Sequence, residues 1–379
     1  MSVERLVRAD GAVVWRVRWR QGERNRSKVL GRKRDAEAFD AEIRRRKRTG
    51  EIALLDAGKQ PLAEFGEEWW RLHAEPNLAP ATLELYAMLW DTHVLPRLGA
   101  IPLRELTPEG IHRFRLDLEA AGTGRVSVRK SLTLLHGVLQ RACEWGRLQS
   151  NPARVVPKPS AARARSIRPL SPETVEAIRV ALLSRGLPRD ATLVSVLAYA
   201  GLRPGEALAL TWGHIRERTI LVEASVSLGA IAETKTRKRR TVRLLAPLAQ
   251  DLAEWRLRAG RPGEDTLVFP DSRGEPWTRP TYQNWRRRIY VPAAEEAGIA
   301  NARPYDLRHS FVSLLIAEGQ NVVDIARQAG HSPTMALNTY AHVFEEFDPA
   351  ERMSAADRIR QAREQVRFAA MQPRLFDVA

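Results

Sequence analysis

The sequence predicts a multidomain protein that is mainly α-helical and carries small β-sheets. Its 379 residues are enough for two or three domains with hydrophobic cores of their own. From residue 58 onward, apolar residues recur mostly at spacings of three and four, which is typical of amphipathic helices. Alternation with a period of two, which is typical of strands, is confined to short runs near the N-terminus and within residues 219–245.

The chain is strongly basic, which predicts a polyanionic partner. Its 61 Lys and Arg residues against 45 Asp and Glu residues give a formal net charge of +16. Residues 1–50 hold 16 basic and 7 acidic residues, so this segment carries +9 of the excess. Nucleic acid is the first expected partner and an anionic membrane surface the second.

Cysteine content and hydropathy favour a soluble intracellular protein. Cys143 is the single cysteine, so we expect neither a disulfide framework nor a Cys-x-x-Cys metal site, and we expect it to be a buried small hydrophobe. The most apolar run, residues 191–202, is too short to span a bilayer, and the N-terminus lacks a signal-peptide core. We expect a cytoplasmic protein that is associated with the nucleoid when it is bound to DNA.

Residues 1–57 are expected to form a small sheet packed by one helix. The run AVVWRVRWR alternates between an apolar and a largely cationic face, a turn follows, and a second strand is expected near residues 26–31. The apolar face holds Val13, Trp15, Val17 and Trp19, and a helix over residues 33–50 turns Ala36, Phe39 and Ile43 inward. The cationic face is either a DNA groove reader or a solvated basic surface. Its arginines are Arg16, Arg18 and Arg20.

Residues 58–155 read as a compact domain of four helical segments, which by itself indicates no function. Residues 156–170 lack apolar periodicity and follow or contain several prolines, so we expect a linker between domains. Its basic side chains are candidates for contact with a phosphate backbone. They are Lys158, Arg163 and Arg165.

Residues 171–349 carry the candidate chemistry. Arg203 stands in a turn between two apolar helical segments, where a guanidinium is costly unless an anion meets it, and Glu206 lies one helical turn later. Taken alone, these two residues are better explained as a structural Arg–Glu pair. Two β-branched runs within residues 219–245 predict an antiparallel ribbon of two or three strands, with Lys235 and Lys238 near its tip.

Two further helices follow this ribbon. Pro304 opens a helix in which Arg308 lies one turn after Tyr305. Gly330 ends the next helix, His331 lies at the bend, and Tyr340 comes nine residues after that histidine. A turn histidine and a core tyrosine would explain the last two residues taken singly.

Taken together, these elements change that interpretation. The runs AGLRPGEAL, DLRHSF and AGHSPTMALNTYAHV occur in an order and at a spacing that resembles the tyrosine recombinase family, also called phage integrases. The resemblance covers residues 60–345, and the basic N-terminal segment resembles the arm-site DNA-binding domain of three-part integrases. It implies a helical SAM-like core-DNA-binding domain over 58–155 and a mixed α/β catalytic domain over 171–349.

The resemblance also implies roles for the candidate residues. Arg203 and Arg308 would hold the nonbridging oxygens of the scissile phosphate, and His331 would donate a further hydrogen bond. Lys235 would protonate the leaving 5′-oxygen, and Tyr340 would attack to form a 3′-phosphotyrosyl linkage. Glu206 would orient Arg203. The covalent intermediate retains the bond energy, so neither ATP nor a metal ion is expected as a cofactor, and the sequence has no P-loop or metal-ligand cluster.

The implied substrate is double-stranded DNA with core and arm attachment sites. The helical and catalytic domains would clamp the core site, and a homotetramer would pair two sites, with DNA-bending and directionality proteins as possible accessories. Residues 350–379 contain a segment with helical periodicity, whose apolar residues are available for burial against the same or a neighbouring catalytic domain. These residues are Met353, Ile359, Val366 and Phe368.

The sequence departs from the family pattern at one position and leaves alternatives open. Tyr305 stands where the family usually has a histidine, and a change to histidine there is expected to leave DNA cleavage intact or improve it. Lys238 is a second candidate for the acid.

Besides a mobile-element integrase, the chain could be a chromosome-dimer resolvase, a type IB topoisomerase or a non-catalytic DNA-binding regulator on the same fold. The resolvase normally lacks the basic N-terminal block, and the intact candidate residues disfavour the regulator.

Overall fold

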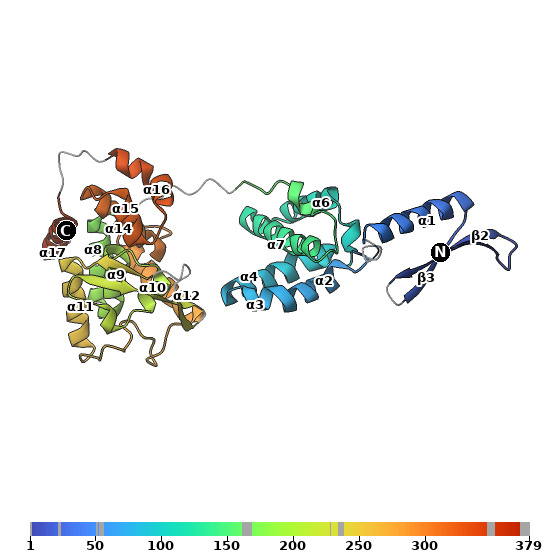
Figure 1. The fold of residues 1–379 in the computed structure, drawn as a ribbon. Coiled ribbons are helices and arrows are strands. Elements are labelled where there is room, and N and C mark those ends of the chain that lie inside the picture. The colour runs from blue at the N-terminus through green and yellow to red at the C-terminus, as the bar shows by residue number, and fades with distance from the viewer. Residues whose placement is uncertain are drawn as a thin grey trace, which may run out of the picture. The chain divides into compact units, whose positions relative to one another are not determined.

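The computed structural model describes residues 2–21, 24–50, 52, 57–160, 169–227, 229–233, 239–346 and 353–371 (Figure 1). The chain divides into two compact units, Met1–Arg163 and Ala164–Ala379. This division lies within the expected linker, and the finer domain boundaries stay predictions. None of the helices in the described part of the chain is long and apolar enough to cross a membrane.

The first unit begins with a three-stranded antiparallel sheet in the order β1-β2-β3. Its strands are β1 (Ser2–Val7), β2 (Val13–Gln21) and β3 (Arg24–Leu30), and helix α1 (Lys33–Arg48) packs on the sheet. Val17, Trp19, Ala36 and Ile43 are buried between sheet and helix. The expected face is therefore present, but β1 was not predicted.

The expected burial is wrong at one end of β2. Val13 is exposed and Val14 is buried, whereas the alternation predicts the reverse. Val13 is the terminal residue of the strand and pairs with Val7, which is also exposed, at the end of the sheet next to the connecting turn. The pattern therefore holds only where the strand is covered by α1.

The rest of the first unit is helical. Two of its four segments pass through a π-helical turn, which keeps α2 continuous with α3 and α4 continuous with α5. The bounds are α2 (Leu62–Trp69), η2 (Trp70–Ala74), α3 (Glu75–Asn77), α4 (Pro80–Leu89), η3 (Trp90–Val94), α5 (Leu95–Leu98), η4 (Leu103–Glu105), α6 (Pro108–Ala120), α7 (Arg125–Glu144) and η5 (Pro152–Val155). A Cβ at Gly66 would lie 2.3 Å from Cζ2 of Trp90, so the indole of one segment packs directly on the backbone of another.

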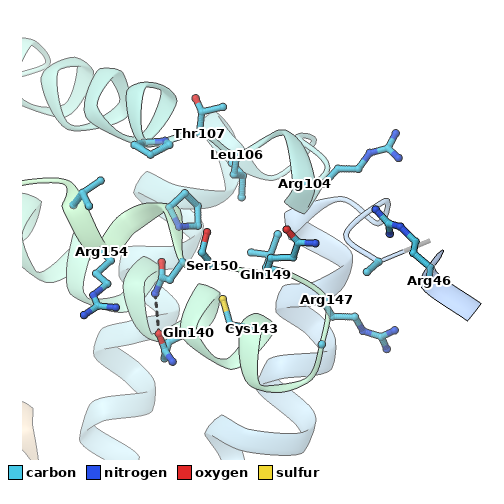
Figure 2. A pocket seen from close by; sticks show the side chains of 17 residues that line it. Arg46, Arg104, Leu106, Thr107, Gln140, Cys143, Arg147, Gln149, Ser150 and Arg154 are labelled. Atoms are coloured by element: carbon cyan, nitrogen blue, oxygen red, sulfur yellow. Dashed lines mark hydrogen bonds between the residues drawn. The ribbon is translucent and has the colours of Figure 1, made fainter. Parts of the chain in front are cut away.

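A cavity of about 830 Å³ opens beside the C-terminal end of α7 (Figure 2). Cys143, Gln149 and Ser150 line it, and the side chain of Asn151 donates hydrogen bonds to Gln140 Oε1 at 3.4 Å and to the carbonyl of His136 at 3.0 Å. Cys143 is half-buried rather than fully buried as expected. Burial raises the pKa of its thiol, which keeps it protonated and unreactive.

The second unit packs its helices around one hydrophobic core. Helices α9 and α14 contact each other at its centre, and α8, α11, α15, α16 and α17 surround them (Figure 1). The helices are α8 (Pro172–Ser184), α9 (Pro188–Tyr199), α10 (Pro204–Leu208), η6 (Trp212–His214), α11 (Ala246–Arg258), α12 (Arg279–Trp285), η7 (Arg286–Tyr290), α13 (Val291–Glu296), α14 (Pro304–Ala317), α15 (Val322–Ala329), α16 (Pro333–Glu346) and α17 (Ala355–Met371). Ser171 caps α8 through its hydroxyl, as its position before Pro172 predicts.

The predicted ribbon contains more strands than expected. Its described residues form β4 (Thr219–Val222), β5 (Ala224–Ser227), β6 (Ala230–Glu233) and β7 (Arg240–Arg243), and β4 pairs with β7 while β5 pairs with β6. Glu223 separates the first two strands, and its carboxylate accepts from Arg239 at 3.2 Å and lies 3.4 Å from Nε2 of His214. The expected two or three strands become four because the chain between Thr219 and Ser227 is divided at Glu223 into two strands that pair with different partners.

Helix α17 packs within the second unit, against α8 and α11. Ala355, Ile359 and Ala362 are buried there. Two of the apolar residues expected to be available for burial, Met353 and Phe368, are instead 42% and 68% exposed.

Candidate active site

Arg203 is fixed at the start of α10. Gly201 takes the left-handed conformation (φ +61°), which turns the chain after α9, and Pro204 fits the first helical position. The Glu206 carboxylate accepts hydrogen bonds from the backbone N–H and the Nη1 of Arg203, both at 2.8 Å. The predicted Arg–Glu pair is therefore present, and the second nitrogen, Nη2, donates to the carbonyl of Gly330 at 2.9 Å.

Glu206 is shared by a second arginine that the sequence did not single out. Arg240 in β7 donates to both carboxylate oxygens, at 2.9 and 2.6 Å, and its Nε donates to the carbonyl of Gln328 at 2.9 Å. Burial alone would raise the pKa of Glu206, but the hydrogen bonds and charges of Arg240 and Arg203 outweigh it and lower the pKa to about 2. The carboxylate is thus an ion that holds two cations in place.

Arg308 is fully buried, although it is a charged residue. Its guanidinium donates to the backbone carbonyls of Gly201 and Ala329, and Nη2 lies 2.9 Å from Nε2 of His331. Burial, and then the charge of Arg203, lower the pKa of Arg308 to about 10. Within the described residues, the hydrogen-bond partners of Arg308 are neutral. Binding of an anion, in addition to the Glu206 carboxylate, would therefore be strongly favoured near Arg203 and Arg308.

His331 follows Gly330, whose left-handed conformation (φ +63°) ends α15. Burial, followed by the charges of Arg308 and Arg203, lowers the pKa of His331 to about 3, so the ring is neutral near pH 7. Because Arg308 donates, Nε2 accepts and Nδ1 carries the proton. In the described part of the chain Nδ1 has no hydrogen-bond partner, which leaves one N–H available to a bound oxygen.

Tyr340 lies on α16 and is fully buried. Its hydroxyl is 2.6 Å from Nδ1 of His309, and burial raises the pKa of the phenol. The charge of Arg308 opposes that rise. The structure therefore hydrogen-bonds the two arginines, Glu206 and His331 into one network, and it connects Tyr340 to that network through helix α14 rather than directly.

Tyr305 and His309 lie on the same face of α14. Their rings meet edge to face with centroids 5.5 Å apart, and Tyr305 is 41% exposed. His309 is a functional candidate that sequence reasoning missed. Because His309 directly follows Arg308 in a helix, its side chain is expected on a different face of α14 from that of Arg308. Only the packing of α16 on α14 shows that the face of His309 meets Tyr340.

Other predicted site residues lie elsewhere. Arg16, Arg18 and Arg20 are on β2, where Arg18 pairs with Glu4 at 3.3 Å, and Lys158 is exposed after η5. Four predicted residues lie outside the described residues: Arg163, Arg165, Lys235 and Lys238. In the part of the chain that the structure describes, no group of three His, Cys, Asp or Glu side chains is arranged to hold a metal ion.

Chemically, the network presents the kinds of donor that would suit a phosphodiester. Two guanidiniums and a neutral imidazole N–H converge from three segments of the chain, at residues 201–206, 308 and 329–331. Planar, charge-assisted donors of this kind match the nonbridging oxygens of a phosphate, and they stabilise the negative charge that grows there during nucleophilic attack.

Two family models match the chain. The model described as the phage integrase family matches residues 169–346, and that described as the phage integrase N-terminal SAM-like domain matches residues 62–118. The network and Tyr340 all lie within the first match.

Similar proteins include an integrase of Streptomyces ambofaciens, 31% identical over 288 residues, which are 70% of this chain and 72% of that protein. A prophage phiRv2 integrase of Mycobacterium tuberculosis is 26% identical over 327 residues, 83% of this chain and 84% of that protein. Among solved structures, the lambda integrase tetramer bound to a Holliday junction has a TM-score of 0.60 at 17% identity and covers 92% of this chain and 98% of that one.

Proposed function

The chain belongs to the phage integrase family of tyrosine site-specific recombinases, and we propose that Tyr340 is the nucleophile with which it cleaves DNA. It is an enzyme of DNA recombination, and its relatives named integrase favour a phage or other mobile element over a chromosome-dimer resolvase. The observation that carries the proposal is the shared anchoring of Arg203 and Arg308. Arg308 donates to the carbonyls of Gly201 and Ala329, and Arg203 donates to the carbonyl of Gly330. The two arginines are thus held by adjacent carbonyls at the end of α15.

The proposed reaction is a transesterification. The Tyr340 oxygen attacks the scissile phosphorus, the bond from phosphorus to the 5′-oxygen breaks, and the 3′-phosphate stays attached to the tyrosine. Arg203, Arg308 and the Nδ1–H of His331 stabilise the charge on the nonbridging oxygens. Lys235, outside the described residues, is proposed to give the leaving 5′-oxygen its proton. Attack by another 5′-hydroxyl reverses the step and rejoins the strand.

Substrate binding must expose the phenol for this reaction. Tyr340 is fully buried and its hydroxyl is engaged by His309. The residues proposed to bind the phosphate are already hydrogen-bonded to one another, although Arg308 among them is as fully buried as Tyr340. We propose that the energy of DNA binding is used to bring α16 and the phosphate together, so that cleavage depends on a bound site.

The protein binds DNA, and we propose which domain contacts which part of the attachment site. The three basic side chains Arg16, Arg18 and Arg20 lie on one strand of the N-terminal sheet, which supports an arm-site role for residues 1–57. Core-site binding is proposed for the helical domain. A homotetramer is proposed for the synapse, on the likeness to the fold of the lambda integrase tetramer, with accessory proteins that bend DNA or set direction.

The proposal is tested with a nicked suicide substrate that carries a candidate core site. Wild-type protein is expected to give a covalent protein–DNA band on a denaturing gel in the presence of EDTA and without ATP, and Tyr340→Phe is expected to give none while it still binds the DNA. Tyr282→Phe, a change of a phenol elsewhere in the same unit, is the matched control and should retain the band. A band of wild-type intensity from Tyr340→Phe would contradict the proposal.

A further inference from the structure

His309 is placed to act on the Tyr340 hydroxyl. Its Nδ1 lies 2.6 Å from that oxygen, its side chain is 8% exposed, and the two rings lie 5.6 Å apart. Burial raises the pKa of the phenol, so the hydroxyl keeps its proton near neutral pH and donates it in this hydrogen bond. The imidazole therefore accepts through Nδ1.

Burial and the charged groups around His309 keep it a neutral acceptor. The pKa of His309 is lowered to about 4, chiefly by burial; Asp306 opposes this shift, and the charges of Arg308 and Arg303 add to it. His331, across the turn between α15 and α16, is itself neutral near pH 7. The His309 ring therefore stays unprotonated over the neutral pH range, and the Nδ1 lone pair that accepts from Tyr340 can take up its proton.

Helix α14 couples this acceptor to the phosphate receptor. Arg308 and His309 are successive residues, and their side chains leave the helix about 100° apart. Arg308 reaches the carbonyls of Gly201 and Ala329, and His309 reaches the Tyr340 hydroxyl. One helical turn thus holds both the group that binds the phosphate and the group that binds the nucleophile.

We propose that His309 is a catalytic residue that accepts the proton of Tyr340 as the phenol attacks, an inference that rests on the proposed role of Tyr340. The O–H bond of the phenol breaks, the proton passes to Nδ1 and the bond from the phenolic oxygen to phosphorus forms. The bond from phosphorus to the 5′-oxygen breaks with a proton from the acid, and the imidazolium returns its proton when the strand is rejoined.

Substrate binding favours this transfer. The phosphodiester brings a negative charge to Arg203 and Arg308, and Arg308 is one of the cations that disfavour a protonated His309. The anion offsets that repulsion, so His309 becomes a stronger base when a phosphate is in place. Tyr305 packs its ring edge on His309 from the exposed side, and a phenol cannot accept a proton near neutral pH.

The test compares His309→Asn, His309→Ala and Tyr305→Phe with the wild-type full-length protein. Asparagine keeps an oxygen acceptor near the position of Nδ1 but cannot take a proton. The first-turnover rate of covalent complex formation on the suicide substrate is measured from pH 6 to 9. DNA affinity and melting temperature are measured alongside and are expected to match wild type for His309→Asn.

We expect His309→Asn and His309→Ala to cleave at least about 100-fold more slowly at pH 7, the usual effect of losing a general base. Their rates should rise with pH across the range, because the phenol must then lose its proton to solvent, whereas the wild-type rate should be flat. Tyr305→Phe should stay within about threefold of wild type. His309→Asn with the wild-type rate and a flat pH profile would overturn the proposal and leave His309 a packing residue.

A second substrate separates the base from the acid. When sulfur replaces the bridging 5′-oxygen, the leaving thiolate needs little help from an acid, since a thiol has a pKa near 8.5. This substrate should restore cleavage by Lys235→Ala and should not restore it in His309→Asn. Restoration of both would contradict the assignment of His309. A wild-type protein that forms no covalent complex, by contrast, would defeat the proposed function itself.

Discussion

At the scale of single residues, the site is organised by one buried carboxylate. The Glu206 carboxylate accepts hydrogen bonds from both Arg203 and Arg240. Arg240 also donates to the backbone carbonyl of Gln328, two residues before Gly330. Because the pKa of Glu206 is lowered to about 2, its contribution to stability is fully present above pH 4.5. That contribution is lost as the pH falls from about 4.5 towards 2.

Removal of the second cation should be costly. Arg240→Ala leaves the buried Glu206 with Arg203 alone, and we expect a loss of about 3 kcal/mol in the free energy of unfolding, measured in urea at pH 7. The matched control is Arg239→Ala, the neighbouring and exposed arginine that pairs with Glu223, which should change stability by less than about 0.5 kcal/mol. Equal effects from the two variants would contradict the role given to Glu206.

Part of the site was predictable from the residues and part was not. The pair Arg203 and Glu206 could be predicted because both lie within one helical turn. The anchoring of Arg308 could not, since its partners are carbonyl oxygens more than 20 residues away, and such acceptors leave no trace in side-chain identity. His309 and Arg240 were missed for the same reason: their partners are set by packing between elements.

At the scale of elements, the turn before α10 carries the greatest constraint. Gly201 has φ +61°, and a Cβ there would lie 2.3 Å from the Cδ1 atom of Phe311, on the helix that holds Arg308. Its carbonyl accepts from Arg308. One glycine therefore fixes both the conformation that presents Arg203 and the approach of α14.

Gly201→Ala should lower both stability and cleavage. The left-handed conformation costs an alanine about 1 kcal/mol and the clash with Phe311 adds about 2 kcal/mol, so we expect a loss near 3 kcal/mol in the free energy of unfolding. Gly186→Ala separates the two effects, because Gly186 has φ +72° but open space around it. It should lose about 1 kcal/mol and retain full cleavage, and a similar loss in both variants would exclude the clash.

Helix α17 joins the catalytic unit through a buried ionic cluster. Arg363 donates to Asp251 at 2.6 Å and contacts Glu176 at 3.3 Å, and Arg179 binds the same two carboxylates at 2.5 Å each. Removal of the helix leaves one arginine for two buried carboxylates. The cluster therefore makes α17 part of the folded unit as well as a candidate for contact between protomers.

Deletion of the residues after Glu351 should weaken assembly on DNA more than DNA binding. Because the deletion also removes Arg363 from the buried cluster, the comparison is made below the melting temperature of the variant, where the tetramer fraction on a paired-site DNA, measured by analytical ultracentrifugation, is expected to fall while the affinity for a single site stays within a few-fold. The matched control is Arg360→Ala, an exposed residue of α17 that pairs with Asp357, which should change neither. An unchanged tetramer fraction after deletion would contradict a role of this segment in assembly.

The predicted elements failed where burial or pairing was incomplete. β1 was missed because SVERLV lacks a clear alternation, and it becomes a strand only by pairing with β2. The sequence predicts only two or three strands in the ribbon because a single polar residue does not by itself end a β-branched run. In the structure, Glu223 separates β4 from β5. The helices around α9 and α14 were predictable because each carries an apolar face or a Pro at its start.

At the scale of the whole molecule, charge and chemistry are divided along the chain. The first 50 residues carry +9 of the net charge of +16, whereas Tyr340 and the residues proposed to bind the phosphate lie between residues 201 and 340. Electrostatic attraction to DNA is therefore expected to be strongest at the N-terminal segment and to fall steeply with salt. Cleavage, in contrast, depends on buried groups that salt screens little.

The central claim, that Tyr340 carries the DNA, is tested most directly by mapping the covalent bond. The complex trapped on a suicide substrate is digested with trypsin and nuclease, and the peptide that retains a nucleotide is sequenced by mass spectrometry. Residues 328–352 form one tryptic peptide that contains a single tyrosine. We predict that the nucleotide is attached to Tyr340 in this peptide. A nucleotide on Tyr305, or on any residue other than Tyr340, would contradict the claim.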